Sequence, residues 1–358
     1  MAPRPYPLKR SPNQGFIPKI GIRSVADNAR VSIATVSRTM NHVQTVDPAL
    51  SARVWKAVAE LNYFPNSQAR ALVSGRSKLL GLIISEITNP FFPELVQEFE
   101  KVAVARGYEI LIGSTNYEHK TMELCARRMF ERQVDGVAIM TFGIEQFLLD
   151  RFASDVVPVI FIDVPSKHAN SNILSVDYRS GICEGVQHLA KLGHRKIGFI
   201  SGPLQHRSAG ARKTAFLDCI RSAGITPNKA WLIEGDHTLE GGRDAMQKIL
   251  ALKKWPTALM CSNDMSAIGV QHALFDANLK VPDDLSLIGF DDIHLAEYTI
   301  PPLTTVQMSC KDLAQTAVTS LLARLSPREA GAETEARITT RLVVRRTTGP
   351  PNNRPSAT

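Results

Sequence analysis

Near the N-terminus, one short segment groups hydroxyl, amide and guanidinium side chains that could contact a DNA duplex. Residues 25–38 read as two helices joined by a turn, and the first residues of the second helix would face base edges in a major groove. Arg38 can make a two-pronged hydrogen bond to guanine, worth about 1–3 kcal/mol of discrimination, while Ile33 and Ala34 can pack on thymine methyl groups. Side chains that can donate hydrogen bonds to phosphate oxygens are Ser32, Thr35, Ser37 and Asn41. The alternative is an ordinary helical hairpin without a role in DNA binding.

The distribution of charge along the chain supports a polyanion-binding role for this region. The 358 residues carry a formal net charge of +8, from 42 basic and 34 acidic side chains. Residues 1–78 hold 12 of the basic and 3 of the acidic side chains, so the rest of the chain is close to neutral. Such an asymmetry indicates a nucleic-acid-binding module in front of a neutral body. A disordered basic tail or a solvated helix face would produce the same imbalance.

Three short helices, here called the headpiece, are predicted to position these side chains. The second helix, over 33–40, can be capped by Ser32, and Asp47 followed by Pro48 can begin the third. A further short helix over 66–74 is predicted to be unstable alone, because it has few internal hydrogen bonds. The first helix has its apolar residues on one face, at Ile22, Val25, Ala26 and Ala29.

From Leu79 onward, apolar segments of strand length alternate with amphipathic segments of helix length. Apolar strands of this kind are typical of parallel sheets that helices cover on both faces. The alternation restarts after Asp177, so we predict an α/β fold class, with two Rossmann-like parallel-sheet subdomains behind the all-α headpiece. With 44 % hydrophobic and 21 % charged residues, the composition is that of a packed globular protein.

Several classes of function are disfavoured by what the sequence lacks. It contains no run of about 18 apolar residues, and its Pro-rich basic N-terminus lacks the apolar core of a secretory signal, so we expect no membrane span and no export. The five cysteines show no pairing pattern, which fits reduced thiols in a cytoplasm. We find no metal-ligand spacing, phosphate-binding glycine loop or nucleophile motif, and therefore expect no metal, no cofactor and binding without turnover.

Longer motifs, in a fixed order, extend this interpretation to most of the chain. They are Glu60-Leu61-Asn62-Tyr63-Phe64-Pro65-Asn66, Asn89-Pro90-Phe91-Phe92, Gly193-His194-Arg195, Ser262-Asn263-Asp264, Gly289-Phe290-Asp291-Asp292 and Pro301-Pro302-Leu303-Thr304-Thr305. With the helix-turn-helix segment, they resemble the lactose-repressor/galactose-repressor (LacI-type) family of bacterial transcription regulators up to about residue 347. One departure is Arg30, in the turn between the helices, where the family usually has Gly. A non-Gly residue with positive φ would cost on the order of 1 kcal/mol there. We therefore expect either that the turn is reshaped or that Arg30 contributes a phosphate contact.

The resemblance implies how the chain is divided. The body is expected to resemble a periplasmic binding protein, with two lobes that close on a small ligand. The implied segments are a flexible basic leader at 1–20, the headpiece at 21–65, a hinge helix and linker at 66–78, a two-lobe body at 79–347 and a tail at 348–358. The implied lobes are lobe 1 at about 79–176 and 307–332, and lobe 2 at about 177–305 and 333–347.

In the hinge, the resemblance implies a second DNA contact, in the minor groove. In the family, a Leu at the position of Leu72 wedges between base steps and kinks the DNA. Ala69 is small enough for the hinge helices of two chains to approach closely, and Tyr63 and Asn66 are further implied DNA contacts. The alternative for Leu72 is an ordinary core residue.

The resemblance also implies an effector site at the carboxyl ends of the strands. Polar residues implied there are Asp163, Arg212, Asn263 and Asp291. This set suits a polyol or a sugar, because hydroxyl groups can donate to carboxylates and accept from guanidinium or amide groups. Arg212 is compatible with a sugar, a sugar acid or a phosphosugar. Further implied residues are Ser85, Phe91, Phe92 and His237. The structural alternatives are a helix cap for Asp163, Asn263 and Asp291, a surface charge for Arg212, core packing for the phenylalanines and a surface loop for His237.

We therefore predict an effector-responsive, sequence-specific DNA-binding transcriptional regulator that represses a sugar or sugar-acid utilisation operon. It is expected to act in the cytoplasm, at the nucleoid, as a homodimer. Its two headpieces would bind half-sites of a near-palindromic double-stranded DNA operator. The alternatives are a sugar-binding protein of the same body fold without a DNA role, and a sugar-active enzyme on a Rossmann-like scaffold.

Overall fold

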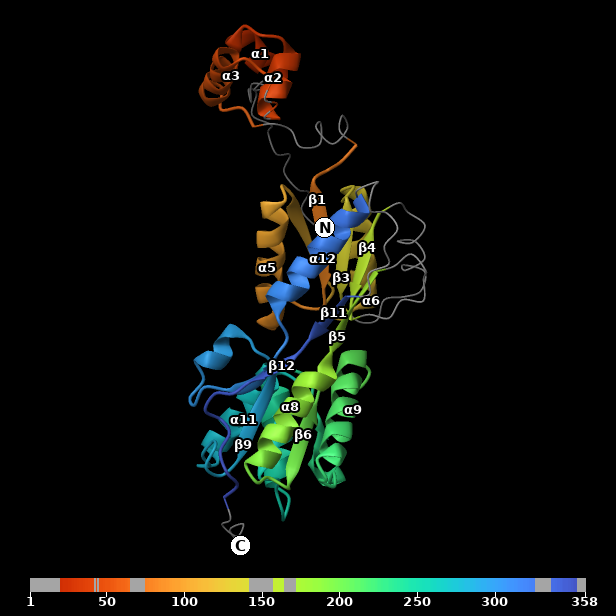
Figure 1. Cartoon of the computed structure of the whole chain (residues 1–358), viewed down its shortest axis with the longest axis vertical. Helices are drawn as coiled ribbons and strands as arrows, with labels where there is room; N and C mark the ends of the chain where they lie inside the picture. Colours follow the sequence, from red (N-terminus) through yellow and green to blue (C-terminus); the bar gives the residue numbers. More distant parts are fainter. Residues whose placement is uncertain are drawn as a thin grey trace, which may run out of the picture. The chain divides into compact units, whose positions relative to one another are not determined.

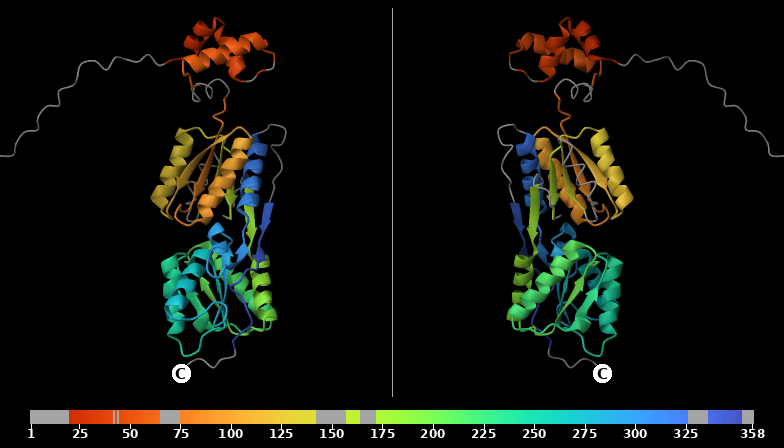
Figure 2. Two further views of the ribbon diagram at one scale, coloured as in Figure 1. Left: turned by 90° about the vertical axis from the view of Figure 1, so that its left-hand side faces the viewer. Right: turned by 90° about the vertical axis from the view of Figure 1, so that its right-hand side faces the viewer.

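The computed structural model describes residues 20–41, 43, 45–64, 75–141, 157–163, 172–325 and 336–352. The chain divides into two compact units, Met1–Ser77 and Lys78–Thr358. Figures 1 and 2 show helices in the first unit and two α/β lobes in the second. Among the described residues, we find no helix of the length and apolarity that a membrane crossing requires. Nor do the described His, Cys, Asp and Glu side chains form a group of three or more that could hold a metal ion.

The headpiece, in the first unit, contains α1 (Ile22–Ala29), α2 (Ile33–Met40) and α3 (Pro48–Glu60). The predicted caps are present. The Ser32 hydroxyl accepts a hydrogen bond from the Thr35 amide at 3.0 Å, and the Asp47 carboxylate accepts one from the Ala49 amide at 2.9 Å. Helices α2 and α3 therefore begin where a side chain replaces a missing backbone partner. The headpiece core comprises Val25, Ala26, Ala29, Val36, Val54 and Ala57.

The turn between α1 and α2 has the left-handed geometry that makes Gly common at the position of Arg30. Arg30 has φ 52° and ψ 51° and ends α1, so the turn is not reshaped. The guanidinium of Arg53, on α3, donates to the carbonyl oxygens of Ala29 at 2.5 Å and Arg30 at 3.0 Å. A side chain from the third helix thus stabilises a turn whose non-Gly residue costs about 1–2 kcal/mol.

Lobe 1 of the body is built on a six-stranded sheet of order β11-β5-β4-β3-β1-β2, in which all pairs are parallel. Alternate residues of β1 face opposite sides: Leu80 packs in the cluster that contains Phe99 of α5, and Ile83 in the cluster that contains Met122 of α6. The strands are β1 (Leu79–Ile84), β2 (Glu109–Ser114), β3 (Gly136–Met140), β4 (Val159–Ile162), β5 (Asn172–Asp177) and β11 (Ala336–Thr339). The helices are α5 (Phe91–Ala105), α6 (His119–Glu131) and α12 (Cys310–Leu325).

Lobe 2 repeats this architecture with the order β12-β10-β9-β8-β6-β7, and β12 alone runs antiparallel to its neighbour. The strands are β6 (Ile197–Ser201), β7 (Leu232–Glu234), β8 (Ala258–Cys261), β9 (Ser286–Asp291), β10 (Thr304–Gln307) and β12 (Arg341–Val343). The helices are α8 (Tyr178–Lys191), α9 (Arg207–Ser222), α10 (Leu239–Leu250) and α11 (Asp264–Asp276), with short turns η1 (Lys229–Trp231) and η2 (His294–Glu297). The predicted fold class, two parallel-sheet subdomains behind a helical headpiece, is confirmed.

Among the described elements, three connections cross between the lobes, and one of them differs from the prediction. The crossings run from β5 into α8, from β10 into α12 and from β11 into β12. The predicted boundary, which places residues from about 333 onward in lobe 2, is wrong for β11. That strand pairs in parallel with β5, with Ala336 opposite Leu174, so it belongs to the lobe 1 sheet and the crossing lies at Thr340.

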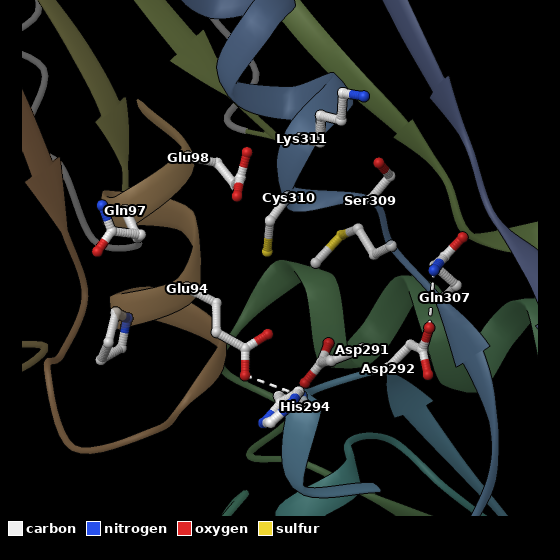
Figure 3. A pocket seen from close by; sticks show the side chains of 12 residues that line it. Glu94, Gln97, Glu98, Asp291, Asp292, His294, Gln307, Ser309, Cys310 and Lys311 are labelled. Atoms are coloured by element: carbon white, nitrogen blue, oxygen red, sulfur yellow. Dashed lines mark hydrogen bonds between the residues drawn. The ribbon is translucent and has the colours of Figure 1, made fainter. Parts of the chain in front are cut away.

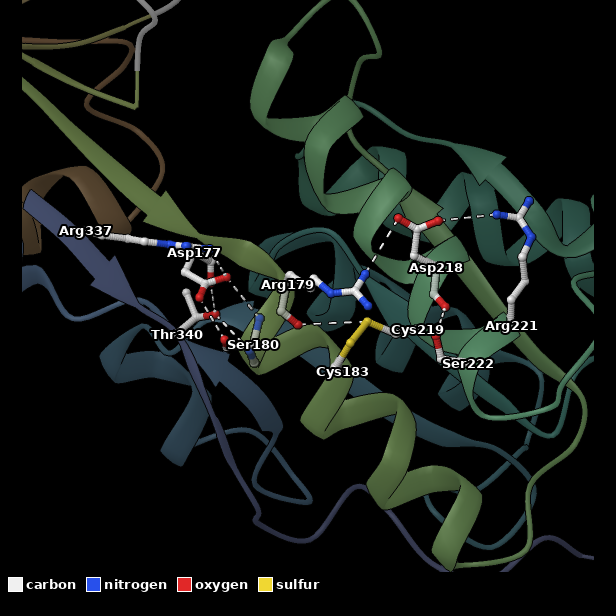
Figure 4. The surroundings of a disulfide bond; sticks show 11 residues. Asp177, Arg179, Ser180, Cys183, Asp218, Cys219, Arg221, Ser222, Arg337 and Thr340 are labelled. Atoms are coloured by element: carbon white, nitrogen blue, oxygen red, sulfur yellow. Dashed lines mark hydrogen bonds and ion pairs between the residues drawn. A yellow bond between two sulfur atoms is a disulfide. The ribbon is translucent and has the colours of Figure 1, made fainter. Parts of the chain in front are cut away.

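The expectation that all cysteines are reduced thiols is wrong for Cys183 and Cys219. Cys183 on α8 and Cys219 on α9 form a disulfide, with their Cα atoms 5.1 Å apart (Figure 4). The two residues are 36 positions apart in the chain, and it is the packing of α8 against α9 that brings them together. The cysteines that remain free are Cys125, Cys261 and Cys310.

Candidate DNA interface and effector site

The candidate base-reading residues lie on the exposed side of α2. Val36 of this helix is buried in the headpiece core, whereas Ile33, Ala34 and Arg38 are exposed. Ile33 exposes 42 % of its surface, which suits a residue that packs against thymine methyl groups. Of the predicted phosphate donors, those exposed are Ser32 and Asn41, and those half-buried are Thr35 and Ser37.

The other predicted DNA contacts belong to the end of the headpiece and the hinge. Tyr63 is half-buried and packs against the headpiece core. Asn66, Ala69 and Leu72 lie outside the described residues.

In the body, a small cavity of about 40 Å³ lies at the carboxyl ends of the strands and is lined by residues of both lobes. Of the predicted effector residues, those that line it are Phe91, Phe92, Arg212, His237, Asn263 and Asp291. Ser85 and Asp163 do not. The remaining lining residues are Asn89, Tyr117, Met140, Tyr178, Ser208 and Met308. Phe91 and Phe92 are only 3 % and 6 % exposed, so they are core residues as well as part of the wall.

Arg212 is the central polar residue of this cavity. It is 6 % exposed, which excludes the alternative of a surface charge. Its guanidinium donates to the Ser262 carbonyl oxygen at 2.5 Å and lies 3.6 Å from a carboxylate oxygen of Asp291. The Cζ atom also stands 4.0 Å from the centroid of the Phe290 ring, a cation–π contact. Burial raises the pKa of the Asp291 carboxyl to about 7, although the charge of Arg212 opposes the rise.

His237 and Asn263 form a second polar group on the lobe 2 side. His237 Nε2 lies 2.9 Å from the Ser262 hydroxyl, and burial lowers the pKa of this imidazole to about 3, so the ring is neutral at pH 7. The Asn263 amide donates to the His237 carbonyl oxygen at 2.8 Å, and its Oδ1 accepts from the Ser266 amide at 3.0 Å. Asn263 therefore both lines the cavity and caps α11. Gly202 leaves room for this arrangement, because a Cβ there would lie 2.0 Å from His237 Nε2.

Asp163 acts on the cavity through Tyr178. The Tyr178 hydroxyl, at the start of α8, donates to the Asp163 carboxylate at the end of β4. Burial raises the pKa of the Asp163 carboxyl. Ser85 is buried beside the cavity wall, where its hydroxyl bonds to Thr141 at 3.3 Å. Sequence reasoning missed Tyr178, although it begins the helix after a crossing strand, and Ser208, although it precedes Arg212 by one helical turn.

A larger cavity of about 480 Å³ adjoins the small one and shares Asp291 and Met308 with it (Figure 3). It reaches from α5 in lobe 1 to η2 in lobe 2. There the Glu94 carboxylate accepts a hydrogen bond from the His294 amide at 2.9 Å. Asp292, on the same rim, is paired with Arg345 at 2.7 Å and accepts from Gln307 at 2.7 Å. Glu94 and Asp292 thus each bind a group from another segment of the chain.

Comparison with known proteins relates both sites to one family. The family model described as bacterial regulatory proteins, lacI family, matches residues 21–66, and the model described as periplasmic binding protein-like domain matches residues 186–348. The chain is 32 % identical over 328 residues to the HTH-type transcriptional repressor PurR of Haemophilus influenzae, covering 91 % of this chain and 97 % of that protein.

Solved structures agree in fold. The lac repressor dimer bound to operator and the anti-inducer ONPF matches with a TM-score of 0.80 and 29 % identity, over 92 % of this chain and 99 % of that one. A LacI family transcriptional regulator from Enterococcus faecium with bound ribose matches with a TM-score of 0.68 and 26 % identity, over 76 % of this chain and 99 % of that one. An exposed recognition helix, a two-lobe body with an internal polar cavity and a relative matched over nearly its whole length lead to one conclusion: this chain belongs to the lacI family of DNA-binding bacterial transcription regulators.

Proposed function

We propose that this chain is an effector-responsive repressor, which acts in the cytoplasm and binds a near-palindromic operator as a homodimer. The observation that carries the proposal is the presence, in one chain, of an exposed recognition helix and a cavity between lobes that holds the buried Arg212–Asp291 pair. Support comes from two similar proteins, one named a transcriptional repressor and one solved as a dimer bound to its operator.

The effector of this proposal is a sugar or a sugar acid, bound without turnover. Arg212 offers several donors, and Asp291 and Asn263 offer acceptors, so adjacent hydroxyl groups can donate and accept at once. A carboxylate on the ligand would pair with the guanidinium in place of Asp291. Phe91 and Phe92 supply the apolar wall that a sugar's C–H face requires. The ribose-bound relative supports this chemical class.

Coupling would run from the lobes to the hinge. An effector that favours one angle between the lobes changes the spacing of two hinges in a dimer, with a coupling free energy of about 1–3 kcal/mol. Leu72→Ser should abolish specific operator binding and leave effector binding intact, as measured by fluorescence anisotropy and calorimetry on the full chain. Unchanged operator affinity in this variant would refute the insertion of Leu72 between base steps.

DNA recognition can be tested by selecting bound duplexes from a random library and measuring their affinity at several salt concentrations. We expect enriched inverted repeats and a steep loss of affinity with salt. Arg38→Ala should relax the preference at one base of each half-site, whereas Arg127→Ala, which removes a charge from α6 in lobe 1, should change nothing. If Arg38→Ala lowers affinity equally for all sequences, Arg38 contacts phosphate instead.

The effector can be tested by thermal shift on the full chain with a panel of sugars and sugar acids that includes ribose. A ligand stabilises the folded chain in proportion to the logarithm of its concentration over its Kd, so the size of the shift reports affinity. Arg212→Met should remove the shift, and Arg221→Ala, an exposed arginine at the other end of α9, should keep it. Equal thermal shifts in both variants would show that the ligand does not bind in this cavity.

The homodimer of this proposal uses an apolar patch on lobe 2. Ile300 is 95 % exposed and Phe275 is 79 % exposed. Large apolar side chains exposed to this extent are typical of a surface that another protein covers. The two residues lie on neighbouring segments, because Gln271, one turn before Phe275 on α11, donates to the carbonyl of Pro301, which follows Ile300. Ile300→Glu should convert a concentration-dependent dimer into a monomer in sedimentation experiments. Exposed Leu124 on α6 provides the control, since Leu124→Glu should leave the dimer unchanged.

A further inference from the structure

Two aromatic rings from opposite lobes stack on each other beside the small cavity. Tyr117 follows β2 in lobe 1, and His206 immediately precedes α9 in lobe 2. Their ring centroids are 4.7 Å apart and their planes differ by 13°. Tyr117 lines the cavity itself, and α9 carries the lining residues Ser208 and Arg212.

Tyr117 is held in place by its own lobe. Its hydroxyl donates to the Glu86 carboxylate at 3.4 Å, and the other oxygen of Glu86 accepts from the Thr88 hydroxyl at 3.0 Å. The backbone is left-handed at both Asn116 (φ 51°) and Tyr117 (φ 59°). Asn tolerates this region, but a bulky residue such as Tyr is rarely found there. Such an outlier persists where surrounding contacts compensate for it, and it often marks a functional position.

His206 presents a flat, uncharged partner. Its backbone amide donates to the Pro203 carbonyl at 2.9 Å, which fixes the loop after β6. Burial lowers the pKa of the His206 imidazole, so the neutral ring is the form that stacks at pH 7. Stacked aromatic pairs of this kind shift an equilibrium by a factor of about two to ten.

The position of the stack gives this contact a role in ligand exchange. The small cavity is lined by residues of both lobes, so a ligand held there contacts both. Separation of the lobes breaks the contacts with one of them and opens the cavity for exchange. Because the two rings belong to different lobes, their separation breaks the stack.

We propose that Tyr117 and His206 form a clasp that holds the lobes closed over the cavity and thereby slows release of the effector. The effect on ligand release rests on the proposed function, in which the cavity binds the effector. The effect on lobe closure can be measured without any ligand. Tyr117 and His206 are positioning residues here, and the polar contacts to the ligand remain with Arg212 and its neighbours.

The test measures lobe closure by single-molecule energy transfer on the full chain. Fluorophores are attached through unnatural amino acids at two exposed positions, Glu123 in lobe 1 and Lys248 in lobe 2. Tyr117→Ala and His206→Ala should each lower the closed-to-open equilibrium constant by about two- to tenfold. The double variant should fall no further than either single variant, because both remove the same contact.

Conservative variants separate the stack from other roles of the two residues. Tyr117→Phe keeps the ring and loses the hydroxyl that bonds to Glu86. His206→Phe keeps an aromatic partner, so both variants should stay near the wild-type closed fraction. An unchanged closed fraction in Tyr117→Ala, or additive effects in the double variant, would overturn the clasp. If the alanine variants do not fold, replacing both aromatics by Leu gives the same comparison with side-chain volume retained.

Ribose is the probe for the kinetic consequence. Its dissociation rate constant, from stopped-flow fluorescence, should rise two- to tenfold in Tyr117→Ala, with a smaller change in the association rate constant. If the wild type binds no ribose or other sugar, the sugar part of the proposed function fails, while the energy-transfer result still decides the clasp. A rise in the association rate constant alone, with an unchanged dissociation rate constant, would contradict the clasp.

Discussion

Reduction of the disulfide between Cys183 and Cys219 should destabilise lobe 2 substantially. The bond joins α8 to α9 and closes a segment of 36 residues. A cross-link stabilises the folded state mainly because it restricts the unfolded chain, and for a segment of this length the chain-entropy relation predicts about 4 kcal/mol at 25 °C. Reduction breaks the S–S bond, yields two thiols and removes this contribution.

Urea unfolding of the full chain measures the effect. Trp231 is a suitable reporter, because it is buried in lobe 2 and its indole donates to the Lys254 carbonyl at 3.1 Å. With dithiothreitol, the urea concentration at the midpoint of wild-type unfolding should fall. The expected fall is about 4 kcal/mol divided by the measured m-value. The Cys183→Ser/Cys219→Ser variant is the matched control, since its midpoint should be low and should not respond to dithiothreitol.

Two results would refute this reasoning. One is the finding, by mass spectrometry, that Cys183 and Cys219 are both alkylated in wild-type protein that was never reduced. That result would mean that the bond is absent. The other is an unchanged midpoint after mass spectrometry has shown complete reduction, which would mean that the unfolded chain is already restricted in this region.

Three further predictions concern the headpiece turn and the cavity. Arg30→Gly should relieve about 1–2 kcal/mol of left-handed strain, less up to about 1 kcal/mol for the entropy of Gly. The headpiece should therefore unfold at a higher urea concentration by Trp55 fluorescence, and a lower midpoint would show that the Arg30 side chain stabilises the turn. Arg53→Ala should cost about 1.5–3 kcal/mol, because two hydrogen bonds from a charged donor are lost; a midpoint equal to the wild type would contradict their importance. Asp291 keeps its proton in the folded chain up to a pKa of about 7 but loses it near pH 4 when unfolded. Relative to Asp291→Asn, the wild type should therefore lose stability as the pH rises from about 4 to about 7, and parallel curves for the two proteins would argue against a buried neutral carboxyl.

The sequence by itself determined the features that depend on residues within one or two helical turns. Ser32 and Asp47 begin helices because their side chains accept bonds from amides two or three residues away. The apolar segment Leu79–Ile84 forms a buried parallel strand because both of its faces carry apolar side chains, which are stable only when other elements cover them. The resemblance to the family indicated the left-handed turn at Arg30. It also indicated that Arg212 and Asp291 are effector residues, although no periodic pattern in the sequence predicts that these two side chains lie close together.

Only the tertiary structure decided which distant side chains meet. The pairing of Cys183 with Cys219 depends on how α8 packs against α9, and the stack of Tyr117 on His206 depends on how closely the lobes approach. Asp163 reaches the cavity through Tyr178 for the same reason, since a crossing strand separates them in the chain. Periodicity and capping report only which face of an element is buried and where it begins. The register between two packed elements is set by the summed contacts of many side chains, and no local pattern contains that sum.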